Sequence, residues 1–153
     1  MGQPQKKSYM IVTLQGVLMI AVAATPFFVE FRPPAVPTQW ADWVGAVGFI
    51  AGMIIVFSAV HTLRRAFTIH TAIRQDTQLV TAYPFNFSRN PMYLGGLLQC
   101  FAWSLLQRSW LTFVLTLALM FLLNFKVQVE EKNLESVFGE VYLKYKNSVR
   151  RFI

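Results

Sequence analysis

Two groups of polar residues could form one binding site in this sequence. The first is Ser88-Arg89-Asn90-Pro91, and the second is the acidic pair Glu130-Glu131. Most residues between them are apolar, enough to enter a bilayer and return, so we expect both groups at one membrane face. The basic group would suit an anion, and the paired carboxylates would suit an ammonium group.

Asn90-Pro91 predicts the start of a helix. Proline suits the first helical position, the residue before a proline avoids helical dihedral angles, and asparagine is a good N-cap. The exposed N–H groups of a helix start favour an anion, and Arg89 would strengthen that field. The alternative is an ordinary helix start whose arginine binds a lipid phosphate.

The acidic pair also has two interpretations. Glu130 and Glu131 lie between Lys126 and Lys132, so they could form a solvated helix face paired with lysines. Acids are unusual beside anionic lipid headgroups, however, which favours a carboxylate that binds an ammonium group.

Closely spaced glycines occur in two of the apolar segments. Gly48 and Gly52 have the four-residue spacing that lets a second helix approach closely. Gly95 and Gly96 lie one turn into the helix that starts at Pro91. They could serve helix packing, or they could leave room for a flat ring or a cofactor tail against the backbone.

The composition indicates a membrane protein. Hydrophobic residues make up 55% of the 153 residues and charged residues 14%, and the mean hydropathy is +0.44. We expect one all-α domain over residues 1–153, a polytopic helix bundle with about four transmembrane helices. The expected spans are residues 9–29, 43–63, 91–106 and 110–125, the last two joined by a tight hairpin at residues 107–109. The first is too long for the apolar core of a signal peptide.

The charges predict the orientation. All Lys and Arg residues except Arg32 and Arg108 fall on one side of these spans, so both termini should be cytoplasmic. We expect an integral protein of a bacterial inner membrane. The net charge of +7 and the four tryptophans suit membrane lipids better than nucleic acid. Cys100 suits packing, and the two histidines lack a third ligand for a metal.

Two segments at the cytoplasmic side complete the expected architecture. The loop over residues 64–90 is long and too apolar for disorder, so we expect it to fold back onto the membrane face. Apolar residues recur at helical spacing over residues 130–147, which predicts an amphipathic surface helix, ended or kinked at Gly139.

Residues 79–95 read LVTAYPFNFSRNPMYLG and residues 130–149 read EEKNLESVFGEVYLKYKNSV. Both resemble the two motif blocks of integral-membrane methyltransferases, the isoprenylcysteine carboxyl methyltransferases and phospholipid N-methyltransferases, in the same order. Residues 79–153 would therefore carry the cofactor-binding motifs. Two positions depart from the family: its Gly-Pro-Tyr turn reads Ala82-Tyr83-Pro84-Phe85, and the histidine of its Arg-His-Pro is Asn90.

The resemblance implies S-adenosylmethionine as methyl donor and a lipophilic acceptor, either a prenylcysteine-like carboxylate or a phospholipid amine. It implies that Glu130 binds the donor's ammonium and that Glu131 supports it or faces the substrate as the catalytic residue. The remaining residues that the resemblance places around the cofactor are Tyr83, Arg89, Asn90, Pro91, Tyr93 and Gly95.

The chemistry fits this resemblance. The donor's carboxylate suits Arg89, and methyl transfer is an in-line displacement that depends on positioning. A carboxylate acceptor needs no base, whereas an amine must lose a proton, for which Glu131 or His70 would be the candidates. Two alternatives stay open: an NADPH-dependent membrane reductase of the sterol-reductase type, which is usually a longer chain, and a relative that keeps the fold without activity. The oligomeric state is not predicted.

Overall fold

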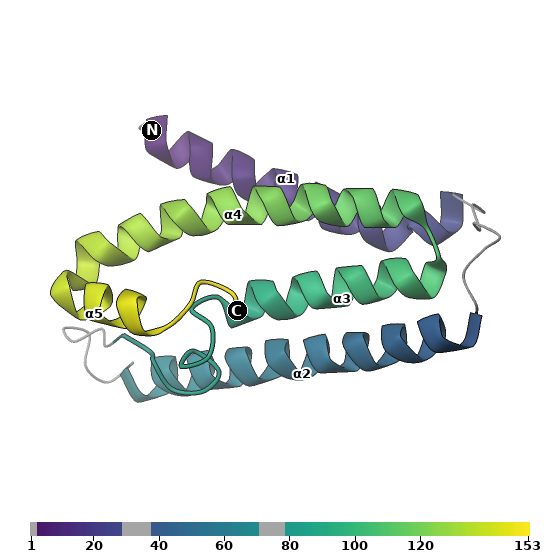
Figure 1. The fold of residues 1–153 in the computed structure, drawn as a ribbon. Coiled ribbons are helices and arrows are strands. Elements are labelled where there is room, and N and C mark those ends of the chain that lie inside the picture. Colours follow the sequence, from purple (N-terminus) through teal and green to yellow (C-terminus); the bar gives the residue numbers. More distant parts are fainter. Residues whose placement is uncertain (1–2, 29–37, 71–78) are drawn as a thin grey trace.

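The computed structural model describes residues 3–28, 38–70 and 79–153, and these residues form helices and turns with no strand. This confirms the all-α class. The five helices, labelled in Figure 1, are α1 (Gln3–Phe28), α2 (Thr38–His70), α3 (Pro91–Gln107), α4 (Trp110–Phe138) and α5 (Glu140–Ser148).

The helices lie side by side. Helix α3 packs between α2 and α4, and α1 packs on the other side of α4. Figure 1 shows the first turns of α1 and α3 at the same end of the molecule as the last turns of α2 and α4, with α5 folded back beside them. The α3–α4 turn lies at the opposite end. This arrangement brings residues near 90 and 130 to one end, as the sequence predicted.

The helices differ in length from the predicted spans. Within the described residues, only Gln39–Arg64 and α4 are long and apolar enough to cross a membrane by length and composition, and Ile11–Pro26 is a shorter apolar stretch. The four predicted spans are therefore not confirmed. Helix α4 runs past the predicted end at residue 125, because no glycine or proline interrupts it before Gly139. Helix α2 runs to His70, so the predicted loop starts later than residue 64, and residues 71–78 lie outside the described residues.

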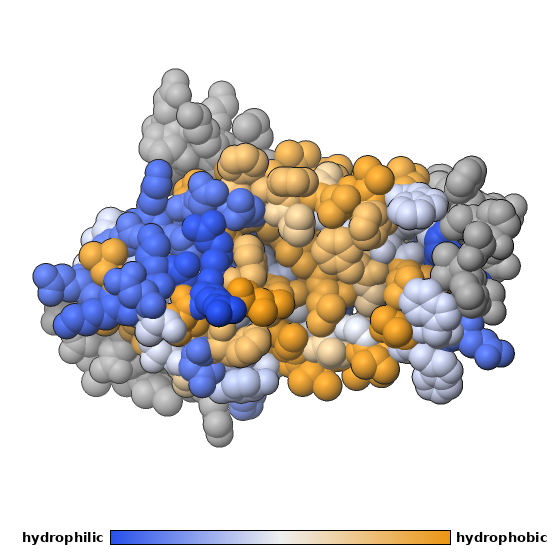
Figure 2. Space-filling view, viewed as in Figure 1, coloured by the Kyte–Doolittle hydropathy of each residue, from blue (hydrophilic) through white to orange (hydrophobic). Residues whose placement is uncertain are grey.

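Figure 2 shows how polarity is distributed over the face in view. An apolar belt crosses the middle, and hydrophilic residues gather at the end that carries α5. Many large apolar side chains are exposed on α2 and α4, among them Trp43, Phe57, Phe121 and Phe125. A belt of this kind between polar ends is typical of a chain that lies in a bilayer.

The hairpin between α3 and α4 is confirmed. Arg108 has a φ of 52°, the left-handed conformation that ends a helix, and its N–H donates to the Leu105 carbonyl over 3.1 Å. Ser109 then caps α4, because its Oγ accepts from the Thr112 N–H. Arg108 Nη2 also donates to both carboxylate oxygens of Asp42 in α2, at 2.8 and 2.9 Å.

Close approach of α2 and α3 depends on glycine. A Cβ added at Gly52 would lie 2.6 Å from the Gly95 carbonyl oxygen, and a Cβ added at Gly95 would lie 2.7 Å from the Gly52 carbonyl oxygen. The predicted packing role of Gly52 is confirmed. The same contact favours the packing alternative for Gly95, because α2 fills the space beside it. The resemblance-based expectation that Gly95 lines the cofactor site stays a prediction.

The two adjacent glycines of α3 provide a matched test of this packing. Gly95→Ala should destabilise the protein by about 1–3 kcal/mol, because the new Cβ meets the α2 backbone. Gly96→Ala should be neutral or stabilising by up to about 1 kcal/mol, because no atom lies within 4 Å of that Cβ and alanine favours helices. Unfolding in one detergent measures both variants. Equal stability of the two would contradict the proposed contact.

Candidate active site

The segment that leads into α3 is held by two other helices. It closes a turn in which the Phe85 N–H donates to the Ala82 carbonyl over 2.8 Å, so a turn forms although the family's glycine is absent. Thr62 of α2 donates its hydroxyl to the Tyr83 carbonyl over 2.8 Å, and Tyr145 of α5 donates to the Phe85 carbonyl over 2.6 Å. Residues 79–90 therefore fold back onto the end of the bundle, as predicted.

The C-terminal residues bind the same segment from the other side. The Arg89 N–H donates to the Arg150 carbonyl over 2.9 Å, and the Arg151 carbonyl accepts from Ser88 Oγ and Asn90 Nδ2. Helix α3 starts at Pro91 as predicted, but the expected capping role of the Asn90 side chain is wrong. Its amide is engaged with the C-terminal backbone instead of with the first turn of α3.

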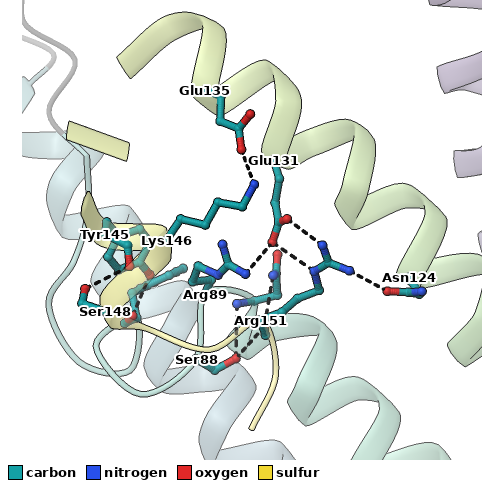
Figure 3. Close-up of polar contacts among 11 residues, drawn as sticks. Ser88, Arg89, Asn124, Glu131, Glu135, Tyr145, Lys146, Ser148 and Arg151 are labelled. Carbon is teal, nitrogen blue, oxygen red and sulfur yellow. Dashed lines mark hydrogen bonds and ion pairs between the residues drawn. The ribbon is translucent and has the colours of Figure 1, made fainter. Parts of the chain in front are cut away.

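Glu131 is buried between two arginines. It is 3% exposed, and its carboxylate lies 3.3 Å from Arg89 Nη2, 2.9 Å from Arg151 Nη2 and 3.2 Å from Arg151 Nε. Figure 3 shows this cluster, with Arg151 also donating to Asn124. Because both carboxylate oxygens accept from guanidinium groups, the geometry argues against the predicted catalytic role of Glu131. It favours the other expectation from the resemblance, that Glu131 supports the site.

Two side-chain nitrogens of Arg89 have no hydrogen-bond acceptor among the described residues. Its side chain is 9% exposed, and its Nε and Nη1 atoms are buried without a hydrogen-bond partner. The buried Tyr142 of α5 lies near the guanidinium: burial and the Glu131 charge raise the pKa of Tyr142, and the Arg89 charge partly offsets this rise. A buried N–H without an acceptor is costly, so these two nitrogens are candidates for binding a further anion.

Glu130 is in a more open position than its neighbour. Its side chain is 40% exposed, and the Tyr93 hydroxyl lies 2.9 and 3.1 Å from its two carboxylate oxygens. Lys126 Nζ lies 3.7 Å from the carboxylate and 5.0 Å from the Tyr93 ring centre, and it donates to Gln15 of α1. A carboxylate beside an aromatic face is a suitable site for an ammonium group, and Lys126 supplies that group here.

Helix α5 closes the end of the site. Gly139 ends α4 with a φ of 54°, as predicted, and its N–H donates to the Glu135 carbonyl. Lys146 of α5 then pairs with the Glu135 side chain (Figure 3). Burial raises the pKa of Tyr145 to about 12, so its hydroxyl stays protonated and continues to donate to Phe85 near neutral pH.

Most of the predicted site residues are brought to this end of the molecule. They are Arg89, Asn90, Pro91, Tyr93, Glu130 and Glu131. The Tyr83 side chain is 60% exposed, and its role in closing the site stays a prediction. His70 ends α2, and its side chain lies outside the described part of the chain.

Sequence reasoning missed Arg151 and Asn124. Arg151 was counted only as a charge that sets membrane orientation, although its place shortly after the second motif block was a signal for a role at the site.

Comparisons with known proteins identify the family and two relatives of this chain. The family model of phospholipid methyltransferases matches residues 40–141. The protein-S-isoprenylcysteine O-methyltransferase of Saccharomyces cerevisiae is 27% identical over 147 residues, which cover 94% of this chain and 62% of the yeast protein. An uncharacterized protein of Haemophilus influenzae is 38% identical over 63 residues, which cover 40% of this chain and all of that protein.

The described residues form helices with an apolar belt and a charged cluster at one end, which is typical of a chain that lies in a bilayer. The family match covers most of the chain, so the chain belongs to the phospholipid methyltransferase family. The resemblance seen in the sequence is confirmed. The chain spans 62% of the length of its yeast relative.

Proposed function

We propose that this protein is an S-adenosylmethionine-dependent methyltransferase that acts on a lipophilic acceptor at a membrane face. The observation that carries the proposal is the presence, at the same end of the bundle, of a buried arginine with two nitrogens that lack an acceptor and of a partly exposed glutamate. The amino-acid tail of the donor has the complementary groups, a carboxylate and an ammonium. Family membership supports methyl transfer over the reductase alternative.

Arg89 would bind the donor's carboxylate through Nε or Nη1, in the field of the α3 N-terminus. Glu130 would bind the ammonium, with Tyr93 fixing the carboxylate in place. When bound, the donor supplies a methyl group on a sulfonium, which transfers in line to the acceptor. The contribution of the protein is to hold the donor in one orientation at the bilayer surface, where positioning can supply much of the rate.

The acceptor would reach this site from the bilayer, because the apolar belt adjoins the polar end (Figure 2). A carboxylate acceptor needs no base. Among the described residues, Glu131 accepts from two arginines and Glu130 is assigned to the donor. His70, the other candidate base, has its side chain outside the described residues. We favour a prenylcysteine-like carboxylate over a phospholipid amine, because a carboxylate needs no base and because the yeast relative is a protein-S-isoprenylcysteine O-methyltransferase.

The donor assignment predicts unequal effects of two glutamate variants. Glu130→Gln should weaken S-adenosylmethionine binding by roughly 10- to 100-fold, because it removes a charge-assisted hydrogen bond worth about 1.5–3 kcal/mol. Glu140→Gln makes the same change of charge on an exposed residue of α5 and should leave the affinity unchanged. Calorimetry on the full chain in detergent measures both. Equal affinities would remove Glu130 from the donor site.

The acceptor assignment predicts which compounds are methylated. With a radiolabelled methyl donor, a prenylcysteine should become base-labile methyl ester, and phosphatidylethanolamine in the same membranes should gain little label. The reverse preference would contradict the carboxylate assignment. Donor binding without transfer to either acceptor or to small hydrophobic acids would favour the alternative of a relative that has lost activity.

We also propose four membrane-crossing segments with both termini in the cytoplasm. The N-terminal end of α1 and the C-terminal residues lie at the same end of the molecule in Figure 1, and the basic residues after α4 gather there. A bacterial inner membrane would fit this orientation by the positive-inside rule.

Cysteine labelling in oriented vesicles tests this topology in a background without Cys100. Gln3→Cys and Ser148→Cys should react with an impermeant reagent from the cytoplasmic side only. Gln39→Cys, at the start of α2, should react from the opposite side only. Opposite accessibility of positions 3 and 148 would mean an odd number of crossings and would overturn the proposal.

A further inference from the structure

Arg151 makes polar contacts with four residues of the candidate site, through its side chain and through its backbone carbonyl. Its Nε and Nη2 donate to the two oxygens of Glu131, at 3.2 and 2.9 Å, and its Nη1 donates to Asn124 Oδ1 over 3.0 Å. Its carbonyl accepts from Ser88 and Asn90. Figure 3 shows Arg151 between α4 and the segment that carries Arg89. Arg151 thus connects α4 with the segment that leads into α3.

Both oxygens of Glu131 accept from Arg151, which leaves fewer acceptor positions for Arg89. Arg89 reaches the carboxylate through Nη2 alone, over 3.3 Å, while its Nε and Nη1 find no acceptor. If Arg151 were absent, both oxygens of Glu131 would be available to Arg89. A bidentate pair is the preferred geometry of arginine with a carboxylate, so Arg89 would then turn toward Glu131.

Hydrogen bonds join the two segments that carry Arg89 and Arg151. Arg89 donates its N–H to the Arg150 carbonyl, and Ser88, which is fully buried, and Asn90 donate to the next carbonyl along the chain. The two guanidinium groups therefore approach Glu131 from segments that are hydrogen-bonded to each other.

We propose that Arg151 is a positioning residue: by occupying Glu131, it keeps two nitrogens of Arg89 available for the carboxylate of the methyl donor. This inference rests on the proposed function. A purely structural role, in which Arg151 only neutralises a buried carboxylate, is the alternative to be separated from it.

Two ligands that differ only in the carboxylate distinguish the positioning role from the structural role. They are S-adenosylmethionine and its decarboxylated analogue, and calorimetry on the full chain in detergent gives the affinity of each. The wild-type protein should prefer S-adenosylmethionine. Arg151→Met should weaken that ligand by roughly tenfold or more, the effect of losing a charge-assisted hydrogen bond, and should leave the affinity for the analogue nearly unchanged.

Two further variants control for charge and for the C-terminal segment. Arg150→Met replaces the neighbouring side chain, which is exposed, and keeps the backbone carbonyl that accepts from Arg89, so it should change neither affinity. Arg151→Lys keeps the charge but cannot make a bidentate contact, so it should restore only part of the preference. If Arg151→Met does not fold, Arg151→Gln provides the same comparison.

Three results would overturn the inference. Equal weakening of both ligands in Arg151→Met would indicate a structural role, and full recovery in Arg151→Lys would indicate that charge alone matters. An unchanged preference would show that Arg89 does not depend on Arg151. These results differ from a failure of the proposed function, in which the wild-type protein itself would bind neither ligand or would not prefer the one with the carboxylate.

Discussion

The burial of the Glu131 carboxylate is the constraint on which the site depends. An ionised carboxylate that is 3% exposed needs compensating partners, and Glu131 receives them from Arg89 and Arg151, which lie on separate segments of the chain. Removing one member of a buried ion pair typically costs about 3–5 kcal/mol, because the other charge is left without compensation. The requirement therefore holds α4, the start of α3 and the C-terminal residues in one arrangement.

The acidic pair shows how adjacent residues acquire different roles. Successive residues of a helix point about 100° apart, so Glu131 faces the two arginines while Glu130 stays 40% exposed beside Tyr93. The Glu131 carboxylate pairs with two arginines inside the protein, and the Glu130 carboxylate is the one that we propose as the partner of the donor's ammonium. The same division applies to the arginines, since Arg151 is fully engaged and Arg89 is not.

Much of this arrangement could be predicted from local sequence signals. Pro91 starts α3, Gly139 ends α4, and Gly52 allows close helix packing, because each acts through its own backbone conformation or size. Contacts between distant segments could not be predicted in this way. The amide of Asn90 binds the C-terminal backbone instead of capping a helix, and α2 fills the space beside Gly95. Arg151 carried only a charge in the sequence, and its role depends on where the last residues fold.

The most direct test of the account is an experimental structure of the protein with S-adenosylmethionine or its demethylated product bound. The account predicts the carboxylate of the ligand within about 3 Å of Arg89 Nε or Nη1, and its ammonium within about 3 Å of a Glu130 oxygen. It also predicts that Arg151 keeps both contacts with Glu131. A ligand bound elsewhere, or bound here with both of those Arg89 nitrogens still without an acceptor, would contradict the account.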